Sequence, residues 1–90
     1  MNTADTVTLI RERLQARFAP AVLEVEDESR HHIGHAGAAG GAGHFRVRIV
    51  ADAFAGLPVL QRHRLVYETL GELMDKRIHA LSIDARAPGS

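Results

Sequence analysis

Histidine is the side chain with the widest choice of chemistry in this 90-residue chain, and four of the six histidines lie close together. These four are His31, His32, His35 and His44. Segment 27–45, which contains them, also holds five of the eight glycines. Imidazole can bind a metal ion, take up a proton near neutral pH, or do neither. The residues therefore indicate a histidine-rich site without deciding what it does.

The composition excludes several classes of site. The chain has no cysteine, so it forms no disulfide, zinc ribbon or iron–sulfur cluster held by its own thiolates. Lys+Arg and Asp+Glu both number 11, and this balance gives no general attraction to nucleic-acid phosphates. The N-terminal residues do not resemble a secretory signal, and no apolar run approaches the ~20 residues that span a bilayer. We expect a cytoplasmic protein that is monomeric when alone and has no membrane partner.

The histidine-rich segment must be held by the elements on either side of it. Apolar residues at helical spacing predict a helix over residues 3–18. Alternating apolar and polar residues predict strands over 22–28 and 44–52. The loop between them, at about 29–43, exceeds the ~12–15 residues beyond which a loop is commonly functional or disordered. His44 opens the second strand, where we expect a structural, hydrogen-bonded role.

The second half of the chain predicts a helical region and a third strand. A helix opens at Pro58, and Gly71 can bend it or divide it in two. One face of this helix carries Val59, His63, Val66, Leu70 and Leu73. A strand over 78–85 places His79 on its apolar face or just off the end of that face. The helical crossover favours parallel pairing of the second and third strands.

Together these elements predict one α+β domain over residues 1–90. We expect two layers, a three-stranded mixed sheet with helices packed on one face, in the order α-β-β-α(-α)-β. The ends, at about 1–4 and 87–90, are expected to be flexible.

Three other interpretations of the histidines stay open. The loop could be a solvated His/Gly segment, and His31 with His35 could form a simple zinc site, although the surrounding glycines argue against the helix that such spacing suits. His63 fits core or interface packing. No nucleophile motif or telling carboxylate pair is present, so we expect no catalysis.

At this point the sequence resembles the BolA family from about residue 10 to residue 87. The segments that carry the resemblance are FAPAVLEVEDES (18–29), GHFRVRIVADAFAGL (43–57), QRHRLVYETL (61–70) and IHALSIDA (78–85). The resemblance implies a fold like that of class II K-homology domains. It also implies a heterodimer with a monothiol glutaredoxin and a [2Fe-2S] cluster shared between the two proteins, in iron–sulfur trafficking or iron regulation.

The resemblance also implies which residues bind the cluster. His79 matches the family's histidine in the IHAL segment, and a second ligand is expected from the loop, where His32 is the first choice and His31 and His35 are its rivals. One iron of a [2Fe-2S] unit accepts imidazoles in Rieske centres, and a chain without cysteine can supply only that side. The partner would then bring its cysteine and a bound glutathione. We expect the partner to face the loop, the His79 end of the third strand and the start of the second helical region.

A DNA-binding transcriptional regulator is the alternative function. The K-homology resemblance suggests it, and Arg62, His63 and Arg64, with Arg46 and Arg48, could form a basic patch. The G-x-x-G spacing at Gly34–Gly37 lies between strands and not between helices, so it does not match the nucleic-acid clamp.

Overall fold

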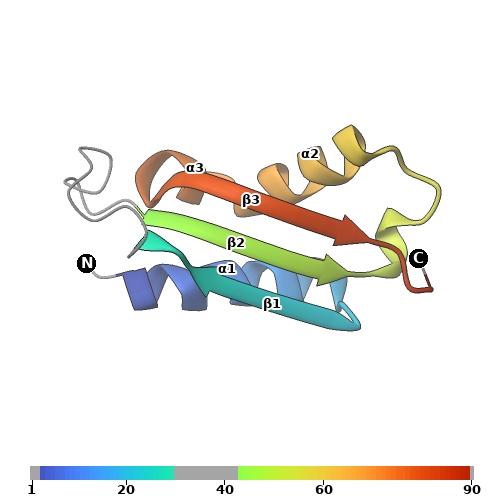
Figure 1. The fold of residues 1–90 in the computed structure, drawn as a ribbon, viewed down its shortest axis with the longest axis horizontal. Coiled ribbons are helices and arrows are strands. Elements are labelled where there is room, and N and C mark those ends of the chain that lie inside the picture. Colours follow the sequence, from blue (N-terminus) through green and yellow to red (C-terminus); the bar gives the residue numbers. More distant parts are fainter. Residues whose placement is uncertain (1–2, 30–42, 90) are drawn as a thin grey trace.

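The computed structural model describes residues 3–29 and 43–89 and consists of one sheet with helices on one of its faces (Figure 1). The elements are α1 (Thr3–Phe18), β1 (Val22–Asp27), β2 (Gly43–Val50), the short 3-10 helix η3 (Asp52–Phe54), α2 (Val59–Leu70), α3 (Leu73–Lys76) and β3 (Ile78–Arg86). The predicted fold class is confirmed, including the division of the second helical region in two. His31, His32 and His35 lie outside the described residues.

The sheet is mixed, with β2 in the centre. β1 pairs antiparallel with β2, and β3 pairs parallel with it, as the crossover predicted. On one face of β2, Phe45, Val47 and Ile49 are buried under the helices. On the other face, Arg46 and Arg48 are exposed, and the register sets them opposite the glutamates of β1. Strand alternation therefore separates an apolar core face from a charged solvent face.

The helices complete the core. Ile10, Leu14 and Phe18 of α1 are buried, and the Phe18 ring lies 5.0 Å from the ring of Phe54 in η3. From α2, Val66 and Leu70 are buried. No helix among the described residues is long and apolar enough to cross a membrane.

One ion pair joins the N-terminal helix to the turn between α2 and α3. Arg13 Nη2 lies 2.6 Å from Glu72 Oε1, and Arg13 Nη1 donates to the Leu70 carbonyl at 2.8 Å. The hydrogen bond from Arg13, with backbone bonding and charge, lowers the pKa of Glu72 to about 2. We call this pair, Arg13 with Glu72, the helix clamp. It holds α1 against the junction at Gly71, whose φ of +53° ends α2.

The start of α2 departs from the prediction. Val59 was expected on the core-facing stripe, but it is 61% exposed, and His63 is only half buried. A pocket of about 370 Å³ separates both side chains from the end of β3, so the first turn of α2 does not reach the core. The stripe prediction is correct only from Val66 onward.

Candidate functional site

His79 lies on a bulge at the start of β3. Gly43 pairs with Ile78, but the next residue, His44, pairs with Ala80, so His79 is an extra residue in the ladder. Ile78 is 4% exposed and His79 is exposed. The prediction that His79 shares the apolar face is wrong, and its alternative, a position just off the end of that face, agrees with the exposed start of β3. A bulge inserts an unpaired residue and re-aims its side chain, which here places an imidazole in solvent.

The ring of His79 lies close to the ring of His44. The two ring centroids are 5.0 Å apart, and the ring planes are inclined by 48°. His44 lies at the start of β2 and His79 at the start of β3, and parallel pairing brings these starts together. Sequence reasoning treated His44 as structural only. The signal that could have identified it was its position, since each histidine directly follows the first residue of one of two parallel strands.

The backbone of His44 is held by the end of β1. Its N–H donates to Ser29 Oγ at 3.1 Å, and its carbonyl accepts from the Glu28 N–H at 2.7 Å. The Ser29 N–H in turn donates to Asp27 Oδ1 at 2.8 Å. These hydrogen bonds fix the backbone of His44 and so the position of its Cβ beside His79.

Gly43 allows this close approach. A Cβ at this position would lie 2.6 Å from Ser29 Oγ and 2.8 Å from the nearest atom of the Phe45 ring. The Gly43 N–H also donates to the Arg77 carbonyl at 3.1 Å, which ties β2 to the residue before β3. A pocket of about 380 Å³ opens beside His44, lined by Glu28, His44, Phe45, Ala80, Leu81 and Ser82.

The described part of the chain supplies two imidazoles here and no complete metal site. In residues 3–29 and 43–89 no group of three or more His, Asp or Glu side chains is placed to hold a metal ion. Two imidazoles on adjacent strands suit the imidazole side of an iron centre whose other ligands come from elsewhere. The loop histidines predicted as ligands cannot be placed, because they lie outside the described residues, between Ser29 and Gly43.

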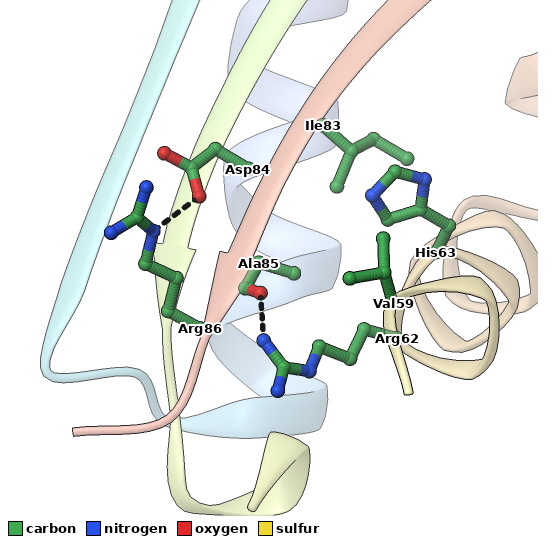
Figure 2. Close-up of a pocket in the computed structure, with 7 residues that line it drawn as sticks. All are labelled: Val59, Arg62, His63, Ile83, Asp84, Ala85 and Arg86. Atoms are coloured by element: carbon green, nitrogen blue, oxygen red, sulfur yellow. Dashed lines mark hydrogen bonds and ion pairs between the residues drawn. The ribbon is translucent and has the colours of Figure 1, made fainter. Parts of the chain in front are cut away.

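The second predicted site consists of Arg62, His63 and Arg64, and the first two of these lie at the other end of β3 (Figures 1 and 2). Figure 2 shows Val59 and His63 facing Ile83 across the pocket, with Arg62 reaching Ala85. Arg62 donates from Nε to the Leu57 carbonyl at 2.8 Å and from Nη1 to the Ala85 carbonyl at 3.1 Å. Its guanidinium therefore ties α2 to β3, and two of its donors are already used.

The remaining arginines do not merge with this cluster. Arg46 lies 3.5 Å from Glu28, and Arg48 lies 3.3 Å from Glu24, so both face carboxylates on the solvent side of the sheet. Arg64 is exposed on another flank of α2, beside Leu65 and Glu68. The arginines of the predicted basic patch therefore lie on separate surfaces. Two of them, Arg46 and Arg48, are paired with glutamates.

The expected partner surface also divides. β3 rises about 23 Å between His79 and Arg86 at ~3.3 Å per residue, and the start of α2 lies at the Arg86 end. One compact surface around His79 does not include the start of α2. The helix and the strand run antiparallel, which puts the start of α2 beside the end of β3 and away from His79. The extent of the partner surface stays a prediction.

A sequence profile of the BolA family, described as BolA-like protein, matches residues 14–90. The chain is 48% identical over 84 residues to SufE-like protein 1, chloroplastic/mitochondrial, of Arabidopsis thaliana, a match that spans 88% of this chain and only 23% of that protein. It is 45% identical over 75 residues to the DNA-binding transcriptional regulator BolA of Escherichia coli, over 82% of this chain and 68% of that one.

The fold agrees with the sequence match. The BolA domain of SufE1 from Arabidopsis thaliana superposes with a TM-score of 0.82 at 44% identity, covering 92% of both chains. The profile spans most of the chain, both relatives exceed 40% identity, and the α-β-β-α-α-β order is shared. The chain is therefore a member of the BolA family.

Proposed function

We propose that this protein is an adaptor that docks on a monothiol glutaredoxin and shares a [2Fe-2S] cluster with it, in iron–sulfur trafficking or iron regulation. The observation that carries the proposal is His79, an exposed imidazole on a strand bulge with a second imidazole 5.0 Å away. A histidine with only a packing role in the strand would not require a bulge that directs its side chain to solvent. A bulge beside a functional site is a common way to aim a ligand.

In this proposal the chain itself does three things. It presents His79 to an iron atom, it offers a second imidazole, for which the family resemblance names His32, His31 or His35, and it keeps the sheet around them rigid. The partner contributes its cysteine and a bound glutathione. The cluster supplies an iron that accepts neutral imidazole, and this ligand change alters its charge and reduction potential.

The test is a titration of the full chain into cluster-loaded monothiol glutaredoxin, followed by visible absorption and circular dichroism. We expect a new heterodimer spectrum that His79→Ala abolishes. His32→Ala reports on the loop, and His63→Ala is the matched control, because His63 lies beside Ile83 and Arg86 at the other end of β3. An unchanged spectrum with wild-type protein, and no complex by size-exclusion chromatography, would refute the proposal.

DNA-binding transcriptional regulation is the second candidate. It is favoured by the name of the Escherichia coli relative and by the arginines of α2. Arg64→Ala is the clean variant, because Arg64 is exposed, whereas Arg62→Ala also removes two bonds that join α2 to the rest of the fold. This candidate requires a duplex affinity that falls steeply with salt, weakens in Arg64→Ala and is indifferent to His79→Ala.

Localisation in the cytoplasm and a monomeric state when alone remain predictions. The name of the Arabidopsis relative places that protein in chloroplasts and mitochondria. Sedimentation velocity of the purified chain tests the oligomeric state.

A further inference from the structure

We propose that the free edge of β3 and the first turns of α2 form a docking site for an extended acidic segment of a partner protein, which adds a strand to the sheet. The site includes the pocket of about 370 Å³ between Val59 and His63 of α2 and Ile83 of β3. We call the free edge together with this pocket the edge groove. It lies at the end of β3 away from His79, so the inference does not depend on the proposed function.

β3 is an edge strand, because it pairs only with β2 in the order β1-β2-β3. The Arg86 carbonyl accepts a hydrogen bond from the Ala51 N–H, so the even-numbered residues of β3 direct their backbone groups toward β2. Leu81, Ile83 and Ala85 alternate with these and direct their backbone groups outward. Among the residues that the structure describes, no hydrogen-bond partner contacts the outward groups of Leu81 and Ile83. A row of unpaired N–H and C=O groups is a template for an added strand.

Arg62 sets the end of this free edge. Its Nη1 donates to the Ala85 carbonyl at 3.1 Å, so that outward acceptor is already used (Figure 2). The free groups extend from Leu81 to the Ala85 N–H, about 13 Å at ~3.3 Å per residue. This length suits a short strand of about four or five residues. An added strand therefore meets the Arg62 guanidinium where the free edge ends.

The charge of Arg62 favours an acidic occupant. Its two hydrogen bonds go to backbone carbonyls, and no carboxylate among the described residues forms an ion pair with it. Asp84 also lines the pocket, but its carboxylate is held by Arg86 at 2.8 Å. The edge groove thus keeps a positive charge whose Nη2 donors bond no described residue. A carboxylate accepts such donors in a strong, charge-assisted bond.

The pocket provides a place for an apolar side chain of the added strand. Val59 and Ile83 face each other across it (Figure 2). Val59 is 61% exposed, and contact with an apolar side chain would remove this aliphatic surface from water. Strand addition characteristically combines main-chain hydrogen bonds with pockets for alternate side chains. We therefore expect acidic and apolar residues to alternate in the partner segment.

Two other occupants fit the edge groove less well. In Figure 1, α2 lies along the outer side of β3, so a second folded copy paired edge to edge would bring its own α2 against this helix. An extended segment needs only one strand spacing, about 4.7–4.9 Å. A single-stranded nucleic acid stacks its bases on aromatic platforms, and the residues that line the described pocket include no Phe, Tyr or Trp.

The experiment uses the full chain and a fluorescein-labelled, end-capped peptide of seven residues in which glutamate and valine alternate. Binding is followed by fluorescence anisotropy, and amide hydrogen exchange in NMR locates the contact. A lysine–valine peptide of the same length controls for charge. Two further forms carry N-methyl groups on all valines or on all glutamates. Since alternate N–H groups of a strand face its neighbour, one N-methylated form should bind and the other should not.

Val59→Asp and Leu60→Asp are the matched variants. Their side chains are 61% and 62% exposed, and an acidic residue is favourable in the first turn of a helix, so both variants should fold. Of the two, Val59 lines the pocket and Leu60 does not. We expect Val59→Asp to weaken binding of the acidic peptide at least about tenfold and Leu60→Asp less than about twofold. His79→Ala should bind this peptide like wild type.

In the complex, the amides of Leu81 and Ile83 should exchange more slowly than in the protein alone. No binding of the acidic peptide, equal binding of the two N-methylated forms, or equal losses in Val59→Asp and Leu60→Asp would overturn the inference. Self-association of the wild type in sedimentation velocity that Val59→Asp abolishes would assign the edge groove to a second copy instead. Displacement of the peptide by an oligothymidylate would assign it to a nucleic acid, and the inference would again be wrong.

Discussion

Gly43→Ala tests how tightly the site is built, because this glycine lies between the end of β1 and the start of β3. Its N–H bonds Arg77, and the residue after it is His44. A methyl group there would lie 2.6 Å from Ser29 Oγ and 2.8 and 2.9 Å from two carbons of the Phe45 ring. The Phe45 ring is 1% exposed and is held in the core, so the serine or the strand must move.

The magnitude follows from three contributions. Overpacking a well-filled site costs about 1–3 kcal/mol. Displacing Ser29 Oγ removes its bond from the His44 N–H, at about 0.5–1.5 kcal/mol. Alanine restricts the unfolded chain more than glycine does, and this offsets about 0.4–1 kcal/mol of the cost. The offset applies here because Gly43 does not have a left-handed φ. The net destabilisation expected is about 2 kcal/mol, which lowers the urea midpoint by about 2 M for a slope near 1 kcal/mol/M.

The assay is equilibrium urea unfolding with two comparison variants. Gly56→Ala has open space around its Cβ but a φ of +74°, so its cost comes from the backbone alone, about 1 kcal/mol. Ser29→Ala removes the shortest contact, so Gly43→Ala should cost about 1 kcal/mol less in that background than in wild type. Wild-type stability of Gly43→Ala, or strict additivity with Ser29→Ala, would refute this reasoning.

Three further predictions test other parts of the fold. Arg62→Ala should lower stability by about 2–4 kcal/mol, because two charge-assisted bonds to backbone carbonyls are lost, while Arg64→Ala should change it by less than about 0.5 kcal/mol in the same urea series. Glu72→Gln breaks the helix clamp. The pKa of Glu72 is about 2 in the folded protein and 4.5 for an unperturbed glutamate, so the stability gap to wild type should be present at pH 7 and close as pH falls from about 4.5 to 2. A gap that persists at pH 2 contradicts the ion pair. Val66→Ala should cost about 2 kcal/mol and Val59→Ala almost nothing by thermal melts, because only Val66 is buried; equal losses would restore the predicted stripe.

The sequence was sufficient for the order of elements and the mixed sheet, because those depend on periodicity and on the rule for crossovers. It was not sufficient at the start of α2. Val59 has the residue type and the spacing of a core position, and its exposure depends on how the helix lies beside the end of β3. The role of Arg62 was equally hidden, since its acceptors are backbone carbonyls, which every residue carries.

Of the two histidines at the candidate site, the sequence predicted His79 and not His44. His79 came from the family resemblance, and its exposure depends on a bulge that strict alternation could not contain. The odd spacing between apolar Ile78 and apolar Leu81 was the available signal. His44 is 35 positions from His79 in the chain, and only parallel pairing in the observed register brings their rings together. The assignment of the loop histidines stays a prediction.

The bulge separates what the fold requires from what the site requires. Ile78 pairs with Gly43, Ala80 pairs with His44, and both would keep these partners and faces in a regular ladder without residue 79. A chain shortened by this one residue would keep Ile78 in the core and would lose only the exposed imidazole. The sheet therefore does not require residue 79. Deletion or insertion of one residue at this position can remove or add the imidazole while leaving the pairing of the strands unchanged.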